Sequence, residues 1–512
     1  MSDTKEIPLV SLKKNIIANY ISQVYTIGIG IVITPLYLQY LGAEPYGLVG
    51  IFALMQAWMS VLDVGLSPTL GRQAAVMRGQ GKSEKNFWAM LKSFEAIFMG
   101  LAVLMVAGIF MASHWLAQHW IKVQSLELST VIACLQIMGI LIGLRWFGAL
   151  YRSGINGLED QVWLNVHNIS IISLKFLGSL VLVATISNQI LHFFVYQLAI
   201  GCIEIMVLMC RFYSRIDKPV QSRYIGFEWS VVKSVMPYAM GIAYTSAIWT
   251  LTTQTDKLIF SKVLPLAEFG YFTLVSLVAG AITLINNPVV QALTPRMTYL
   301  YAKGDKEKLI RLYRDSSQIT AVIALCVVSM VSMYAQPLLY AWTGDQTAAA
   351  WGADVLFWFA LGNGVMLIGA YPYYMQKAMG KLKWHVIGST LMATLQVPII
   401  YWAATTHGAV GAGKAWFIFL SVWFVLWTPF VHRQLIPALH LTWLLRDILP
   451  VLATVLAVVW LQGILFEISY DLSRQLILLK IAVIGLAVLI TCSISSRLVR
   501  NVVAKKWNMI NA

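Results

Sequence analysis

The stretch Tyr40-Leu-Gly-Ala-Glu-Pro-Tyr-Gly-Leu-Val-Gly-Ile-Phe-Ala-Leu54 has a second copy, Val263-Leu-Pro-Leu-Ala-Glu-Phe-Gly-Tyr-Phe-Thr-Leu-Val-Ser-Leu277. The two copies align without a gap, so that Gly47 meets Gly270. At the same offset the match continues into charged segments, at Glu84-Lys85 and Glu307-Lys308. Two unrelated apolar helices would not be expected to share charged loop residues as well. The repeat therefore predicts a chain built from two related halves.

The composition places most of the chain in a membrane. Of 512 residues, 59% are hydrophobic and 12% are charged, whereas soluble domains carry about a quarter charged residues. A backbone in lipid must satisfy its hydrogen bonds internally, so the spans are predicted to be helices. About 14 apolar segments can cross a hydrocarbon core of roughly 30 Å: 15–38, 46–70, 90–112, 128–151, 163–186, 188–211, 234–260, 267–293, 314–341, 354–376, 384–404, 410–431, 446–466 and 475–497.

The charged loops predict that both termini are cytoplasmic. With this orientation nearly all loop Lys and Arg residues face inward, and the exceptions are Lys122, Lys262, Lys414 and Arg474. The net charge of +15 then reflects inner loops that face an anionic leaflet, and no nucleic-acid partner is expected. The N-terminus carries no cleavable signal pattern. The five cysteines lie in or beside spans, so neither disulfides nor a metal site are predicted.

The repeat divides the chain into an all-α, polytopic arrangement of two six-helix bundles and two extra helices. The predicted parts are a cytoplasmic tail (1–14), an N-terminal bundle (15–211), a cytoplasmic linker (212–233), a C-terminal bundle (234–435), and two further helices with a basic tail (436–512). Membrane transporters are commonly built from two such repeats, with the substrate site between them.

Charged residues at membrane depth are the candidate site, because an unpaired charge there costs roughly 2.5–3.5 kcal/mol or more. In one interpretation, Lys175–Glu204 or Glu95–Arg145 pairs lock neighbouring helices. In the other, basic residues line a cavity for a phosphate-bearing substrate, since arginine can donate two hydrogen bonds at once to phosphate. The basic candidates are Arg145, Lys175, Arg152 and Arg72. For the acidic candidates, ion coupling and helix pairing both stay open: Asp63, Glu95, Glu204 and Asp256.

Aromatic residues supply a further candidate. The run Tyr371-Pro-Tyr-Tyr374 ends a predicted span. Such residues commonly form an interfacial belt, but the rings of Tyr371, Tyr373 and Tyr374 could also stack on sugars.

Several motifs in this order resemble one known family. Asn15 and Asn19 precede Pro35-Leu-Tyr-Leu-Gln-Tyr-Leu-Gly42, and Leu62-Asp-Val-Gly-Leu66 precedes Arg72. In the second half, Asp256-Lys-Leu-Ile-Phe-Ser261 precedes Phe269-Gly-Tyr271. From about residue 13 to 435 the chain resembles the polysaccharide transporter family (Wzx-type O-antigen and exopolysaccharide flippases) of the multidrug/oligosaccharidyl-lipid/polysaccharide (MOP) superfamily. The motifs are more specific for the superfamily than for a substrate.

The resemblance implies a fold and an activity. The implied fold is a MATE-like, two-lobed core of twelve helices with a cationic cavity. The implied activity is translocation of undecaprenyl-pyrophosphate-linked oligosaccharide (O-antigen, capsule or exopolysaccharide units) across the bacterial inner membrane by alternating access. By position, the implied cavity residues are Arg145, Lys175, Asp63, Arg72 and Asp256. Expected partners are membrane lipid, a polysaccharide polymerase and a chain-length regulator. No cofactor is expected, and proton or sodium coupling stays open.

Two alternatives compete with this interpretation. An ion-coupled exporter of lipid II or of drugs belongs to the same superfamily, although drug exporters favour acidic cavities and the charges here are mainly basic. A membrane polysaccharide polymerase or glycosyltransferase would need catalytic loops, and the outer loops are short. The sequence shows no nucleophile–base pair or metal cluster, so it does not predict an enzyme. The aligned second half lacks charges matching Glu95, Arg145, Lys175 and Glu204, so the pyrophosphate is expected at the first half.

Overall fold

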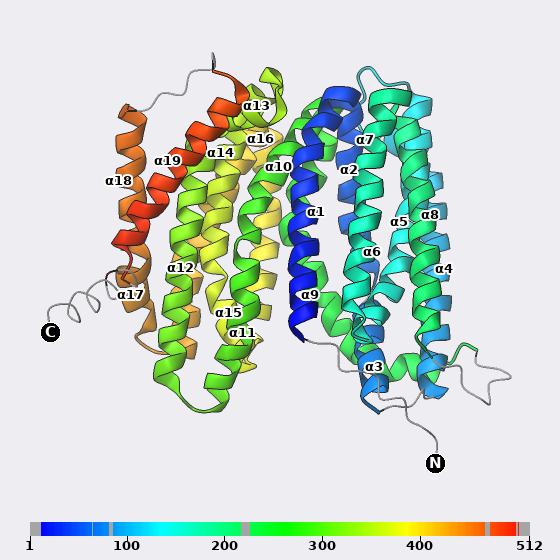
Figure 1. Cartoon of the computed structure of the whole chain (residues 1–512), viewed down its shortest axis with the longest axis horizontal. Helices are drawn as coiled ribbons and strands as arrows, with labels where there is room; N and C mark the ends of the chain where they lie inside the picture. The colour runs from blue at the N-terminus through cyan, green and yellow to red at the C-terminus, as the bar shows by residue number, and fades with distance from the viewer. Residues whose placement is uncertain are drawn as a thin grey trace. The chain divides into compact units, whose positions relative to one another are not determined.

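The computed structural model describes residues 12–63, 65–80, 85–216, 226–465, 472–497 and 500. These residues form helices joined by short turns, and the described part contains one isolated β-bridge, between Lys122 and Pro265. The chain divides into two compact units, Met1–Gly270 (unit 1) and Tyr271–Ala512 (unit 2). Figure 1 labels the helices of both units.

Unit 1 contains long helices interrupted by short 3₁₀ and π-helical turns, which are labelled η. Its elements are α1 (Leu12–Leu41), α2 (Ala43–Met59), η1 (Ser60–Asp63), α3 (Leu66–Gln80), α4 (Lys85–Trp115), η2 (Leu116–Trp120), α5 (Leu128–Gly157), α6 (Gln161–Ser173), η3 (Leu174–Gly178), α7 (Ser179–Val181), η4 (Leu182–Ile186), α8 (Ile190–Ser214), α9 (Trp229–Val263) and the start of α10 (Leu266–Leu284).

Unit 2 contains the rest of α10 and nine further helices with one π-helical turn in its described part. Its elements are α11 (Asn286–Ala302), α12 (Lys306–Met333), α13 (Ala335–Thr343), α14 (Gln346–Gly369), α15 (Tyr371–Met379), α16 (Lys383–Leu435), α17 (Leu439–Trp443), η5 (Leu444–Ile448), α18 (Leu449–Leu465) and α19 (Arg474–Ser495).

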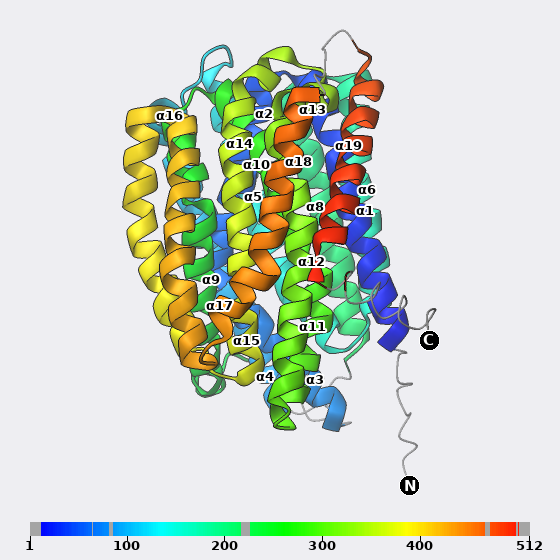
Figure 2. The same ribbon diagram turned by 90° about the vertical axis from the view of Figure 1, so that its left-hand side faces the viewer.

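Helix α16 consists of two legs. Gly408 has a φ of 65° and a ψ of −158°, which interrupts the helix. The legs run side by side, because the rings of Trp384 and Phe430 lie 4.9 Å apart, and Figure 2 shows both legs. The prediction of two separate spans, 384–404 and 410–431, is therefore confirmed.

The described helices confirm an all-helical, multi-pass membrane protein. Twelve helical segments are long and apolar enough to cross a membrane, and α16 counts once among them although it has two legs. The 35-residue α9 covers the predicted span 234–260 and is not among the twelve. The cytoplasmic placement of the termini stays a prediction, as do the domain boundaries drawn from the repeat.

Helix α5 is central to the core of unit 1, where it packs on α3, α4 and α8. Its buried residues recur every three or four positions from Val131 through Leu135 and Met138, which is the spacing of one helical face. The rings of Phe98 and Trp146 lie 4.7 Å apart in this core. Lipid supplies little hydrophobic drive between helices, so this close packing holds the unit together.

The repeated glycines contact each other within unit 1. A Cβ atom on Gly270 would lie 2.6 Å from the carbonyl oxygen of Ala43 and 3.2 Å from the nitrogen of Gly47. A Cβ atom on Gly47 would overlap the carbonyl oxygen of Leu266. The first turns of α2 and α10 therefore pack backbone to backbone, which requires glycine at both positions.

Lys122 and Glu44 support the same contact. The carbonyl oxygen of Lys122 accepts a 3.0 Å hydrogen bond from the nitrogen of Leu266, and its Nζ donates to Val263 O at 2.7 Å. The carboxylate of Glu44 accepts from the backbone nitrogens of Gln124 and Ser125. The short segment after η2 thus ties the start of α2 to the turn between α9 and α10.

The predicted spans 46–70 and 267–293 are not continuous helices, which corrects the sequence prediction. The first breaks between η1 and α3, where Gly65 has a φ of 71°. The second breaks between α10 and α11, beside Asn286. Asp63 aligns with Asn286 in the repeat, so both halves break at the matching position. The sequence prediction extended each span across the break, although polar residues and a proline, Pro68 in the first half and Pro288 in the second, follow it.

Candidate functional site

Two helical elements of unit 1 bring basic residues to one carboxylate on a third. Glu204 on α8 accepts from Arg152 of α5, whose Nη2 lies 2.6 Å from Oε1, and from Lys175 of η3. Arg152 also donates to the side chain of Asn168 on α6. The side chains of Lys175 and Glu204 are only 10% and 12% exposed, against 37% for Arg152. The Lys175–Glu204 pair, one of the predicted alternatives, is therefore present.

Arg145 adds a third positive charge to this cluster. It lies two turns before Arg152 on the same face of α5, and its charge interacts with Glu204. Its guanidinium carbon lies 4.9 Å from the ring centre of Phe52, a cation–π distance. Its buried Nε atom has no hydrogen-bond partner within the described residues. A buried donor without a partner is costly, so Arg145 carries a hydrogen-bonding group that the described residues leave unsatisfied.

The cluster carries more positive than negative charge. Arg145, Arg152 and Lys175 surround the single carboxylate of Glu204, which leaves a surplus of two positive charges. A buried ion pair must repay its desolvation, and one carboxylate cannot neutralise three cations. Lys175 lies in the π-helical turn η3, and such turns are frequent at functional sites. We name Arg145, Arg152, Lys175 and Glu204 the cation cluster.

Sequence reasoning missed two polar neighbours of the cation cluster. Asn168 contacts Arg152, and the adjacent His167 interacts electrostatically with Glu204, Arg152 and Lys175. The His167 ring stacks on Trp163 at 5.1 Å, and its buried Nε2 has no partner among the described residues. Both residues stand near the start of a predicted span, where polar side chains are ordinary, so their position in the sequence gave no signal.

Glu95 forms a separate cluster. Its carboxylate accepts from Lys92 at 2.9 Å, from the hydroxyl of Tyr151 at 2.8 Å, and from Tyr213. It does not pair with Arg145, which had been the alternative to the Lys175–Glu204 pair. These contacts join α4, α5 and α8 and favour helix pairing as the role of Glu95.

Asp63 and Arg72 flank the first two turns of α3. Asp63 accepts from the nitrogen and hydroxyl of Ser67, at 3.0 and 2.9 Å, at the start of α3. A Cβ atom on Gly65 would overlap the carbonyl oxygen of Ala239 on α9. Asp63 and Gly65 of the family-like motif thus shape the break before α3. Arg72 is an exposed residue of α3.

Asp256 in α9 has one carboxylate oxygen without a partner. Its buried Oδ1 atom has no hydrogen-bond partner within the described residues. Its neighbour Lys257 donates to Gln254 at 3.0 Å. An orphaned carboxylate oxygen at depth is expensive, which keeps ion coupling open as a role for Asp256.

The three candidate tyrosines of unit 2 differ in burial. Tyr371 is fully buried in the core and donates to Ser316 O at 2.8 Å. The hydroxyl of Tyr374 accepts from Asn286 at 3.1 Å. The ring of Tyr373 lies 4.1 Å from that of His385. In this structure Tyr373 and Tyr374 are partly exposed and would be the residues to meet a sugar.

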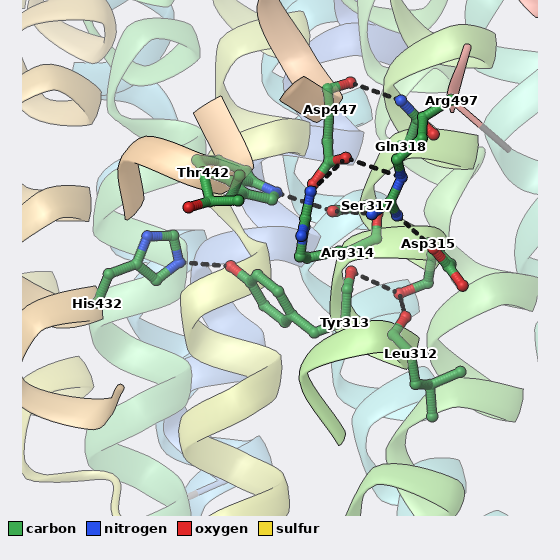
Figure 3. Close-up of polar contacts among 12 residues, drawn as sticks. Leu312, Tyr313, Arg314, Asp315, Ser317, Gln318, His432, Thr442, Asp447 and Arg497 are labelled. Carbon is green, nitrogen blue, oxygen red and sulfur yellow. Dashed lines mark hydrogen bonds and ion pairs between the residues drawn. The ribbon is translucent and has the colours of Figure 1, made fainter. Parts of the chain in front are cut away.

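Unit 2 contains a buried charge network that the sequence did not indicate (Figure 3). Asp447 of η5 is fully buried and accepts from Arg314 of α12 at 2.6 and 3.1 Å. Arg497 lies 3.3 Å from the same carboxylate and 2.5 Å from Asp315. These residues border predicted loops, so in the sequence they look like the solvent-exposed ends of membrane spans. The network attaches the extra helices α18 and α19 to α12.

The described residues contain no group of three or more His, Cys, Asp or Glu side chains placed to hold a metal ion. All five cysteines are free, and three are buried.

The sequence of this chain is similar to those of known proteins. Residues 12–300 match the family described as "Polysaccharide biosynthesis protein". A Shigella flexneri protein named as a candidate O-antigen transporter is 19% identical over 406 residues, which is 79% of this chain and 90% of that protein.

Solved structures share the fold. The lipid II flippase MurJ, in an inward closed conformation, aligns with a TM-score of 0.68 and 14% identity over 94% of this chain and 98% of its own. An inward-facing multidrug resistance MATE family transporter of the MOP superfamily aligns with a TM-score of 0.63 and 15% identity over 84% and 99%. The predicted MATE-like fold and family are confirmed, and these proteins are transporters rather than enzymes. The chain belongs to the polysaccharide biosynthesis protein family and is a multi-pass membrane protein that shares the fold of these transporters.

Proposed function

We propose that this chain is a flippase that moves polyprenyl-pyrophosphate-linked oligosaccharide, such as an O-antigen, capsule or exopolysaccharide unit, across the bacterial inner membrane. The observation that carries the proposal is the surplus of two positive charges in the cation cluster. A pyrophosphate diester carries about two negative charges at neutral pH, so the bound pair would be close to neutral. Arg145 supplies an unpaired donor, and arginine suits phosphate geometrically.

The physical problem such a protein solves is the passage of charge and sugar through hydrocarbon. The lipid tail is compatible with the bilayer, while the pyrophosphate and glycan need a polar path. Alternating movement of the two repeat-related halves would expose that path to each side in turn. A proton or sodium ion as the driving ion stays a prediction, as do a polymerase and a chain-length regulator as partners.

Removal of single cations tests this proposal. Arg145→Ala or Lys175→Ala should abolish export of surface polysaccharide and cause lipid-linked repeat units to accumulate, with normal amounts of protein in the membrane. Arg211→Ala is the matched control, because Arg211 is a cation on α8, the helix that carries Glu204, but it pairs with Asp160 at 2.6 Å instead. Normal export by both cluster variants would refute the role of the cation cluster.

Lipid II is the alternative substrate of the same chemical class, since it also carries a pyrophosphate. MurJ, a lipid II flippase, has the same fold, so the alternative can be tested by asking whether this chain replaces such a flippase. Rescue of cells depleted of their lipid II flippase would favour it. Rescue of a strain that lacks its O-antigen flippase, without rescue of the lipid II strain, would favour the oligosaccharide substrate.

A further inference from the structure

A chain of hydrogen-bonded rings lies between α12, the second leg of α16 and α17 in unit 2. His432 is fully buried, and its Nε2 atom lies 2.6 Å from the hydroxyl of Tyr313, as Figure 3 shows. Its other ring nitrogen, Nδ1, lies 3.0 Å from Nδ1 of His440. Both nitrogens of a buried imidazole are therefore engaged, and one contact joins two histidines.

The two histidines differ in their exposure to the surroundings of the protein. The ring of Trp443 lies 5.0 Å from His432 and 5.9 Å from His440. Trp443 is fully buried, whereas His440 is partly exposed. A proton from outside can therefore reach His440 first, and His432 only through His440.

Counting hydrogens shows how many protons the two rings can hold. Each neutral imidazole carries one N–H, and the contact between the two Nδ1 atoms needs one donor and one acceptor. When His440 donates in this contact, His432 accepts it and donates from Nε2 to the oxygen of Tyr313. The Nε2 atom of His440 then has a free lone pair. One added proton fits there, whereas a second would place two N–H groups against each other at 3.0 Å.

The charged groups near the rings are either paired with one another or exposed. On α12, Arg314 follows Tyr313 but is bound to Asp447, and Asp447 is shared with Arg497. Tyr371 of α15 packs edge-on to Tyr313. The adjacent cations of α16 and η5, Arg433 and Arg446, are exposed and screened by solvent or lipid headgroups. The buried carboxylate is thus already committed, and the added charge would be shared between the two imidazoles.

We propose that the His432–His440 pair is a binding site for a single proton in unit 2. The proton binds Nε2 of His440 from the exposed side, and the resulting imidazolium donates through Nδ1 to His432. A charge-assisted hydrogen bond of this kind is stronger than a neutral one. The proposal does not rest on the flippase function.

Ring nitrogen NMR on the full-length protein tests the site directly. The chain has eight histidines, and labelling them with ¹⁵N in detergent micelles allows each ring to be followed between pH 8 and 5. Loss of signals in His432→Asn and His440→Asn assigns the pair. We expect both rings to shift with one common midpoint and to gain one proton in total. In His440→Asn, the ring of His432 should stop responding over this range.

His385 provides the matched control, because it lies on α16 with its ring against Tyr373 rather than another histidine. His385→Asn should leave the common midpoint of the pair unchanged. Separate midpoints for the two rings, two protons gained, or no response between pH 8 and 5 would each overturn the proposal. So would continued titration of His432 in His440→Asn. None of these readouts depends on glycan export, so failure here is distinct from failure of the cation cluster.

Discussion

Replacing Gly270 by alanine should separate the first turns of α2 and α10. The new Cβ atom would lie 2.6 Å from the carbonyl oxygen of Ala43, whereas unstrained heavy atoms sit roughly 3.5 Å apart. The two backbones must therefore move apart by roughly 1 Å. Overpacking of this kind costs about 1–3 kcal/mol. Alanine returns roughly 0.5–1 kcal/mol through lower backbone entropy in a helix, so we expect a net loss of stability.

Gly280→Ala is the control for this prediction, since it changes the same helix. A Cβ atom on Gly280 meets nothing within 4 Å, so only the favourable entropy term applies. Unfolding of the purified proteins in detergent, followed by heat or denaturant, compares the two variants. Gly270→Ala should unfold at lower temperature or denaturant concentration than the wild type, and Gly280→Ala should not. Equal stability of the two variants would show that α2 and α10 do not pack backbone to backbone.

Two further predictions concern the buried charges. Asp447→Asn should lower the free energy of unfolding by about 3–5 kcal/mol, because Arg314 loses its buried partner; denaturant unfolding measures this, and Arg314→Gln in the same chain should restore part of the loss. Glu95→Ala should cost about 1.5–3 kcal/mol, since its carboxylate accepts hydrogen bonds from two tyrosines and Lys92. If Glu95→Ala instead altered the ion dependence of transport at unchanged stability, ion coupling rather than helix pairing would be its role.

Much of the fold could be predicted because its signals are local. The apolar runs predicted the helices, and Gly408 separates two legs at the place where two spans were expected. The repeat predicted related halves, and both halves break at the aligned positions Asp63 and Asn286. The breaks themselves were missed. The first break depends on the positive φ of Gly65 and on the hydrogen bond from the nitrogen of Ser67 to Asp63, and a count of apolar residues over a long window does not register either feature.

The candidate site could be predicted only as a set of residues. Burial cost singled out Arg145, Lys175 and Glu204, because a charge at depth needs a partner. The cost of burial does not say which charges pair with each other, so a Glu95–Arg145 pair stayed open as an alternative. The structure shows Glu95 bound to Tyr151 and Tyr213 instead. Tyrosines are common at membrane interfaces, and nothing in their spacing marks them as partners of an acid.

The sequence by itself determined that this protein is a repeated, helical membrane protein whose charged residues at membrane depth lie mostly in its first half. Hydropathy and repeat spacing run along the chain, so they can be read without the fold. Only the tertiary structure decided that Glu204 serves both Lys175 and Arg152, and that Asp447 meets Arg314 from far along the chain. Ion pairs form between distant segments, and their geometry follows from how the helices pack. For the same reason, the repeat shows only that Gly47 and Gly270 are equivalent positions. The structure shows that the backbones at these positions pack against each other.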